Sequence, residues 1–286
     1  MKDRSLNIVD HCTFAYNGVV LAFVLLFHSR IPQWHLLILP NIIAIAVVLL
    51  LALVVGDRAA LVPRLVRNLA PLGFFLPMYI QIGSINHIVF PDFLDPLFIR
   101  IEENIFGFQP AVVFAQRFSQ NWIAEYMHFA YATYYLLFPG LGAFLYLRRE
   151  KPAFLDYMFS LCATMYVCLL TYIILPVRGA VSFGLGDAPE SASLPFTAAM
   201  AWIYRHLETE GAAFPSSHVA IASLVLYYTV RYARSAAWVV GPLVISLITA
   251  TVYCRYHYAI DVLAGLATTA ILLPLWRRIN PALHPQ

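Results

Sequence analysis

Charged side chains are scarce in this sequence, because Asp, Glu, Lys and Arg together make up 12 % of its 286 residues. Soluble globular domains carry about twice that share. With 61 % hydrophobic residues and a mean hydropathy of +0.74, the composition excludes an ordinary soluble domain and indicates a polytopic membrane protein. The net charge of +3 is small and dispersed, so it does not indicate a nucleic-acid partner.

Cysteines are also few, and their spacing excludes a zinc site of the paired C-x2-C kind. All four fall in or beside apolar stretches, where we do not expect disulfides. No tandem repeat stands out, and we expect no cleaved signal peptide. We therefore expect a single membrane domain over residues 1–286, while the oligomeric state stays open. The cysteines are Cys12, Cys162, Cys168 and Cys254.

Eight apolar stretches are long enough to cross a bilayer, which takes about 20 helical residues. They predict an all-α fold, a polytopic membrane helix bundle. The segment 91–120 differs, since charged residues alternate there with Phe, Leu and Ile, and this predicts amphipathic helices along the interface. Another short amphipathic helix is expected over 196–207. The eight predicted spans are residues 10–28, 35–55, 69–90, 121–147, 154–175, 215–233, 236–254 and 258–276.

The basic residues predict how these spans are oriented. If the N-terminus is cytoplasmic, the inner segments hold twelve Lys and Arg residues and the outer segments hold six. Both termini are then cytoplasmic, and the two polar clusters described next face the periplasm, lumen or exterior. The inner set is Lys2, Arg4, Arg58, Arg64, Arg67, Arg148, Arg149, Lys151, Arg231, Arg234, Arg277 and Arg278; the outer set is Arg30, Arg100, Arg117, Arg178, Arg205 and Arg255.

The first polar cluster opens the sixth predicted span, in the run Phe214-Pro215-Ser216-Ser217-His218. Pro215 suits the first turn of a helix, and the free amides of that turn, including those of Ser216 and Ser217, are expected to face an anion. His218 can carry a proton near neutral pH. Taken alone, such a pattern is more often a capped helix start with an incidental histidine than a functional site.

The second polar cluster runs from Arg255 to Asp261, at the end of the seventh span. His257 and Asp261 are four residues apart, so a helix would place them on one face. The carboxylate can then hold one imidazole nitrogen and leave the other free to attack a substrate. Arg255 adds a cation whose planar fork matches phosphate oxygens. A ring of interfacial polar residues is the alternative, and the presence of both clusters favours a site.

The two clusters resemble the second and third signatures of the type-2 phosphatidic acid phosphatase superfamily, Pro-Ser-x-His and Ser-Arg-x5-His-x3-Asp. The resemblance implies a phosphohistidine mechanism without a metal or other cofactor, in which His257 is the nucleophile, Asp261 orients it and His218 protonates the leaving oxygen. It also implies a six-helix phosphatase-like core over residues 69–276, with the two helices of residues 1–68 as an addition.

The first signature of that superfamily, Lys-x6-Arg-Pro, is matched only in part. Thr171 stands at the lysine, Arg178 at the arginine and Gly179 at the proline. By the resemblance, Arg178 is a phosphate ligand, and the pocket lacks one cation of the family pattern.

The third signature also departs from the pattern, because Ala250 and Thr251 replace Ser-Arg. Arg255 follows Thr251 by four residues, one helical turn, and from there it can supply the missing guanidinium. The expected phosphate ligands are Arg178, Arg255, Ser216 and Ser217.

The fourth span begins with a stripe of Glu125, His128, Tyr131 and Tyr135 at helical spacing. Two interpretations stay open: a headgroup pocket level with the histidine clusters, or an interfacial aromatic belt with one Glu–His pair. The long loop over 176–214 likewise is either a cover over the site or a plain solvated loop.

Two reactions fit this chemistry. A phosphomonoester carries close to two negative charges near pH 7 and a phosphodiester carries one, so the missing lysine favours a diester. We therefore expect transfer of a phosphorylated headgroup between membrane lipids, whether phospholipid, sphingolipid or polyprenyl phosphate. The run from Phe93 to Pro110 and the tyrosine-rich fourth span resemble the inositol phosphorylceramide synthase-like branch.

Three alternatives remain beside transfer. The same His/His/Asp machinery can hydrolyse lipid phosphomonoesters or pyrophosphates. A non-enzymatic transporter is less favoured, because the polar clusters lie at helix ends and no repeat is found. A metal hydrolase is less favoured because the familiar zinc spacings are missing.

Overall fold

A computed structural model of the chain describes residues 6–56, 59–185 and 194–279. Within them every regular element is a helix, apart from one β-bridge between Val177 and Ala212, so the all-α prediction is confirmed. The chain termini and residues 186–193 of the predicted cover lie outside the described residues. The α-helices are α1 (Ile8–Leu26), α2 (Trp34–Val54), α3 (Leu61–Gly73), α4 (Phe75–Ile82), α5 (Asp95–Phe106), α6 (Pro110–Arg117), α7 (Asn121–Ala132), α8 (Tyr134–Leu147), α9 (Lys151–Ile174), α10 (Pro195–Leu207), α11 (Ser217–Tyr232), α12 (Ala237–Tyr253) and α13 (Ala259–Ile279).

Six helical stretches among the described residues are long and apolar enough to cross a membrane, which indicates a multi-pass membrane protein. The other two predicted spans take a different form. The stretch predicted to cross over 69–90 is divided at Phe74 into α3 and α4, and α4 ends at Ile82. The span predicted over 215–233 becomes α11, which has 16 residues. The six stretches are Ile8–Leu26, Trp34–Val54, Asn121–Leu147, Lys151–Ile174, Arg234–Tyr253 and Ala259–Ile279.

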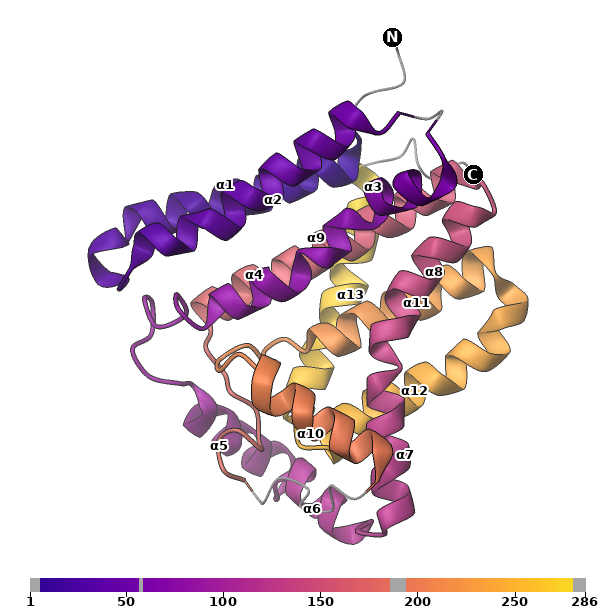
Figure 1. The fold of residues 1–286 in the computed structure, drawn as a ribbon. Coiled ribbons are helices and arrows are strands. Elements are labelled where there is room, and N and C mark those ends of the chain that lie inside the picture. The colour runs from indigo at the N-terminus through magenta and orange to yellow at the C-terminus, as the bar shows by residue number, and fades with distance from the viewer. Residues whose placement is uncertain (1–5, 57–58, 186–193, 280–286) are drawn as a thin grey trace.

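Helix α9 is the centre of the bundle. Other helices bury 78 % of its apolar window, compared with 39 % or less for the other five candidate spans. It packs against α1, α4, α8, α11 and α13, and Figure 1 shows it running through the middle of the molecule. Because α9 is enclosed, it can hold its neighbours in register around the site.

The two N-terminal helices form a hairpin that packs on α9 and α3 (Figure 1). The ring of Tyr16 stacks on that of Tyr166 with centroids 4.6 Å apart. Arg67 on α3 donates to buried Asp10 on α1, with Nη1 2.9 Å from Oδ1. A buried ion pair is costly to break, so this contact fixes the hairpin at one end of the bundle.

The predicted amphipathic helices of 91–120 are present as α5 and α6, and that of 196–207 as α10. All three lie toward the lower end of the view in Figure 1, whereas α1 begins and α13 ends toward the upper end. The inward face of α5 carries two acidic residues, Asp95 and Glu102, each 0 % exposed. This was not expected, because acidic residues of an interfacial helix ordinarily face water.

Candidate active site

Two histidines face each other between α11 and α13. His218 lies in the first turn of α11, and His257 lies in the short segment between α12 and α13. The Nε2 atom of His257 is 3.4 Å from Nδ1 of His218. On its other side, Nδ1 of His257 is 3.4 Å from Oδ2 of Asp261, and these two residues are 4 % and 0 % exposed. The predicted nucleophile, acid and orienting carboxylate are thus brought together.

The His257–Asp261 contact does not arise from a shared helix face. Helix α13 begins at Ala259, so His257 precedes it and Asp261 in its first turn reaches back. Asp261 Oδ2 also accepts the amide of Tyr258 at 2.9 Å, which fixes the turn between them. The four-residue spacing is therefore correct for the contact, but the backbone that makes it is a helix entrance.

The start of α11 is bound to the start of α13. The amide of Ser216, the N-cap residue, donates to the carbonyl of Asp261 at 3.1 Å. Gly265 allows this approach, because a Cβ there would lie 2.6 Å from the carbonyl oxygen of Ser216. Glycine is the one residue that fits so close to a backbone. The contact holds His218 opposite His257.

The prediction for the serine amides needs correction. The Ser216 amide is used on Asp261, and the Ser217 amide donates to the hydroxyl of Tyr172 at 3.2 Å, which in turn donates to the carbonyl of Pro215. The Ser216 amide therefore links α11 to α13, the Ser217 amide links α11 to α9, and neither points outward toward an anion. Pro215 likewise precedes the N-cap and is not in the first turn. Of the two serines, Ser217 lines the pocket described below.

Asp95 on α5 holds the segment that carries Arg178. Its Oδ2 accepts the amide of Arg178 at 3.0 Å, and its Oδ1 accepts the amide of Gly179 at 3.1 Å and the hydroxyl of Tyr258 at 2.9 Å. Burial raises the pKa of this carboxyl, and the three hydrogen bonds oppose that rise. Asp95 thus links Arg178 to Tyr258, the residue that follows His257.

Gly179 explains why the proline of the first signature is missing. Its φ is +89°, and a Cβ there would lie 2.4 Å from the carbonyl oxygen of Tyr256. Proline fixes φ near −65°, so it cannot take this conformation. Next to it, the guanidinium of Arg178 lies 4.8 Å from the ring centre of Phe93 and pairs with Glu210.

Glu102 follows Asp95 on the same helix, α5, and supports the start of α13. Its Oε1 accepts the amide of Ile260 at 3.2 Å. A carboxylate suits this position, because the free amides at a helix start carry partial positive charge. Burial raises the pKa of Glu102 from 4.5 to about 7. The alternation of charged and apolar residues over 91–120 predicted an interfacial helix, but nothing in the sequence showed that the two acids would turn inward.

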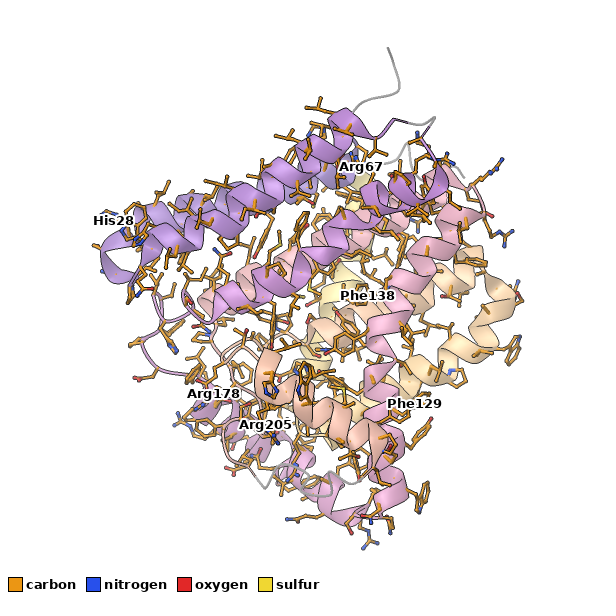
Figure 2. All side chains as sticks on the ribbon, viewed as in Figure 1. His28, Arg67, Phe129, Phe138, Arg178 and Arg205 are labelled. Atoms are coloured by element: carbon orange, nitrogen blue, oxygen red, sulfur yellow. The ribbon has the colours of Figure 1, made fainter. Side chains whose placement is uncertain are left out.

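The two histidines open into a cavity of about 360 Å³. Its polar end contains Arg178, Ser217, His218 and His257, and its walls carry tyrosines from several helices. Its apolar end lies among α3, α4, α8 and α9. In Figure 2, Phe138 lies inside the bundle and Arg178 toward the lower end. The apolar lining residues are Leu72, Phe75, Leu76, Phe138, Met165 and Leu169.

The family pattern of the PAP2 superfamily matches residues 97–275, well over half of the chain. The chain belongs to the PAP2 superfamily. It is therefore an enzyme, a phosphatase or phosphotransferase acting on phosphate esters, and the transporter alternative is set aside. Comparison with curated proteins gives no match, and neither does comparison with solved structures.

Of the two interpretations of the 176–214 loop, the described residues favour a cover over this PAP2 site. Helix α10 supplies Met200, Ile203, Tyr204 and Leu207 to the cavity wall, followed by Glu208 and Thr209. The ring of Tyr204 stacks on Tyr256 with centroids 4.7 Å apart. Within the described residues, the segment between Arg178 and His218 thus closes one side of the PAP2 pocket.

The predicted headgroup stripe is divided between two places. Tyr131 and Tyr135 line the PAP2 pocket, and the Tyr131 hydroxyl is 2.9 Å from Nε2 and 3.3 Å from Nδ1 of His218. His128 is buried outside the described pocket wall, with Nδ1 2.7 Å from the Ala124 carbonyl oxygen. The helix also breaks at Thr133, so Tyr135 belongs to α8 and not to α7.

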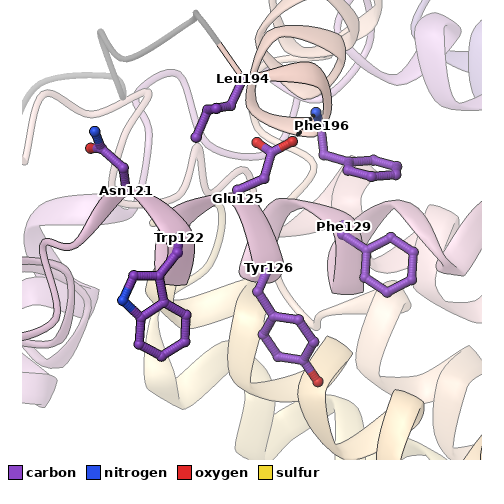
Figure 3. A pocket seen from close by; sticks show the side chains of 7 residues that line it. All are labelled: Asn121, Trp122, Glu125, Tyr126, Phe129, Leu194 and Phe196. Atoms are coloured by element: carbon purple, nitrogen blue, oxygen red, sulfur yellow. Dashed lines mark hydrogen bonds between the residues drawn. The ribbon is translucent and has the colours of Figure 1, made fainter.

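Glu125 turns away from the PAP2 pocket toward the start of α10. It accepts the amides of Phe196 and Thr197 at 2.7 and 3.0 Å, and the Thr197 hydroxyl at 2.8 Å. These bonds satisfy free amides at the start of α10. Figure 3 shows this contact beside a second recess of about 530 Å³, whose wall is largely aromatic. That wall is Asn121, Trp122, Glu125, Tyr126, Phe129, Leu194 and Phe196.

Helix α12 ends at Tyr253, and Arg255 lies beyond that end with a left-handed backbone, φ 62°. It therefore does not share a helix face with Thr251, which corrects the geometry behind that prediction. Its carbonyl accepts the amide of Val181 at 2.8 Å. The side chain is not part of the described pocket wall, whereas that of Arg178 is. Among the described residues, no cluster of three His, Cys, Asp or Glu side chains is arranged to hold a metal ion.

Proposed function

We propose that this PAP2 enzyme transfers a phosphorylated headgroup between membrane lipids through a phosphohistidine on His257. The observation that carries the proposal is the facing pair of His257 and His218, 3.4 Å apart, at the polar end of a pocket whose other end is apolar. Asp261 beside Nδ1 of His257 favours the tautomer with its proton on Nδ1. Nε2 then carries the lone pair that attacks phosphorus.

The reaction has two displacement steps. First, Nε2 of His257 bonds to phosphorus, the bond from phosphorus to the donor lipid's oxygen breaks, and His218 gives its proton to that oxygen. Second, an acceptor hydroxyl gives its proton to His218 while its oxygen displaces Nε2 from phosphorus. If water is the acceptor, the same steps amount to hydrolysis, which is the alternative reaction.

The substrate must part the two histidines. A phosphoryl group needs more room than the 3.4 Å between Nε2 and Nδ1, because it must contact one nitrogen through phosphorus and the other through oxygen. We propose that the His218 ring turns as the substrate binds. The Tyr131 hydroxyl supports this, since it lies within 3.3 Å of both ring nitrogens and can hold the ring in more than one orientation.

A lipid substrate is supported by the shape of the pocket. Leu76 on α4 and Tyr135 on α8 both line it, and their exposed fractions are 46 % and 42 %. We propose that a lipid enters the pocket between these two helices, at the apolar perimeter of the bundle. An acyl chain lying against Phe75, Phe138 and Leu169 would bring its headgroup to the histidines. Burial of each CH₂ group contributes about 0.8 kcal/mol to such binding.

A phosphodiester is favoured over a phosphomonoester by charge. Thr171 takes the place of the family lysine, and its hydroxyl donates to the carbonyl of Val167 at 2.8 Å. Arg178 is then the one arginine in the described pocket wall. We propose that Arg178 holds the phosphate oxygens, with Arg255 adding its charge from outside the wall. The run from Phe93 to Pro110 and the tyrosine-rich fourth span support the further proposal that the chain is similar to the inositol phosphorylceramide synthase-like branch.

Trapping the intermediate tests the proposal. Purified enzyme in mixed micelles is mixed for a short time with lipid labelled in its phosphate, and acid-labile label on the protein is measured. We expect label on the wild type and on His28→Ala, a control histidine far from the pocket (Figure 2), and none on His257→Ala. His257→Ala and His218→Ala should lower turnover by at least about 10²-fold. Near-normal turnover by His257→Ala would end the phosphohistidine proposal.

The products separate the two reactions. Mass spectrometry of the lipids should find the headgroup phosphate on a new lipid if the enzyme is a transferase. Release of water-soluble phosphate or phosphorylated headgroup, with no new lipid, would make hydrolysis the better description.

We also propose that the site faces the periplasm, lumen or exterior, with eight crossings and cytoplasmic termini. The twelve-to-six basic bias supports the orientation. The count of eight crossings is supported by the packing of α3 on α8, of α4 on α9, and of α11 on α9, α12 and α13. An impermeant thiol reagent added from outside should label Arg205→Cys and should not label Arg149→Cys. The wild type, whose four cysteines are buried or half-buried, gives the background. The reverse labelling would overturn this orientation.

A further inference from the structure

One acidic residue, Glu208, lines the pocket on the side covered by α10. Its Oε1 accepts the hydroxyl of Ser182, which also bonds to the hydroxyl of Tyr204. Tyr79 approaches from α4, with its hydroxyl 3.5 Å from the amide of Thr209, the next residue. Tyr79 and Tyr204 both line the pocket, so the carboxylate is set among aromatic side chains.

The protein balances the charge of Glu208 only in part, through hydrogen bonds from hydroxyl groups and through the more distant guanidinium of Arg178. Within the described residues Glu208 forms no ion pair, and the arginine of the pocket, Arg178, is paired with Glu210 instead. Burial raises the pKa of Glu208, which means that its charged form lacks full stabilisation. A carboxylate in the wall repels a substrate that is only an anion, and the repulsion grows as water is excluded.

A ligand with charges of both signs removes this conflict. Its phosphate can lie at His257 and Arg178, while an ammonium group lies at Glu208 and over the tyrosine rings, which attract cations. We propose that Glu208, with Tyr79 and Tyr204, is the subsite for the ammonium group of a zwitterionic phosphodiester headgroup. The inference rests on the proposed phosphohistidine function and adds the class of substrate to it.

The test compares two diesters with the same acyl chains, phosphatidylethanolamine and phosphatidylglycerol, of which only the first has an ammonium group. The measurement is kcat/KM for loss of each lipid in mixed micelles. For the wild type we expect the value for phosphatidylethanolamine to be at least about tenfold higher. In Glu208→Gln the preference should fall to about twofold or less, because only the amine-bearing lipid loses an interaction. Glu103→Gln, an exposed acid on α5, is the matched control and should keep the preference.

The outcomes distinguish this subsite from a structural role. Equal loss of kcat/KM on both lipids in Glu208→Gln, or no preference in the wild type, would overturn the proposal. Tyr204→Phe keeps the ring and should keep the preference, whereas Tyr204→Leu should reduce it. Acid-labile label on His257 is measured in parallel with both lipids. Label without a headgroup preference overturns the ammonium subsite alone, while absence of label from every substrate overturns the proposed function.

Discussion

Replacing Asp95 with asparagine tests whether a residue outside the signatures positions the catalytic groups. The substitution keeps the size of the side chain and one acceptor oxygen. If that oxygen stays with Gly179 and Tyr258, the new NH₂ group faces the amide of Arg178, and the 3.0 Å hydrogen bond is lost. A hydrogen bond to a charged group contributes about 1.5–3 kcal/mol, and two donors left facing each other add to the loss.

The lost hydrogen bond should lower activity, because Asp95 holds the backbone of Arg178 and the side chain of Tyr258, which follows His257. At about 1.4 kcal/mol for each factor of ten, we expect kcat/KM to fall roughly 10- to 100-fold. Tyr258→Phe removes one neutral donor and should cost less, about fivefold, since a typical hydrogen bond contributes about 1 kcal/mol.

The assay is steady-state turnover of the preferred lipid by purified variants that elute as one species and have wild-type helix content. Asp92→Asn is the control, because it removes the same charge from an exposed position three residues away. Turnover of Asp95→Asn within twofold of the control would refute the positioning role, whatever its effect on stability.

Three further predictions concern the same region. Gly179→Ala should destabilise the protein by at least about 1–2 kcal/mol in detergent melts, and Gly179→Pro should be worse although it restores the family residue, since both clash with Tyr256. Burial raises the pKa of Glu102 from 4.5 to about 7, so its contribution to stability is complete below pH 4.5 and is lost as the pH rises through about 7. In Glu102→Gln the melting temperature should depend less on pH across that window. Arg178→Ala should lower kcat/KM more than Arg255→Ala, and the opposite order would assign the phosphate to Arg255.

The amino-acid pattern was sufficient for the helical class, the interfacial helices and the proximity of His218, His257 and Asp261. Apolar stretches of the right length and two polar clusters at their ends carry that information. Two predicted spans are not among the six candidate spans. The one predicted over 215–233 keeps nearly those bounds as α11 but has 16 residues, and the one predicted over 69–90 is divided at Phe74 and ends at Ile82, which hydropathy alone does not register.

The supporting residues of the site could not be predicted in the same way. Asp95 and Glu102 looked like the polar face of an interfacial helix, and their burial depends on where α5 packs in three dimensions. Arg255 was placed one turn after Thr251 on a continuous helix, but its left-handed backbone ends that geometry. Glu125 was a candidate pocket residue by its helical spacing, yet it accepts the amide of Thr197, 72 residues later in the chain, at the start of α10.

The N-terminal hairpin contributes no side chain to the described pocket wall, although it is tied to the core through Asp10 and Arg67. We therefore expect a change in this hairpin to alter how many molecules fold correctly, and to leave the rate and substrate preference of each folded molecule unchanged. In cells, substitutions in these two helices should change the amount of folded enzyme, whereas substitutions in α5 or α10 should change its rate or substrate preference.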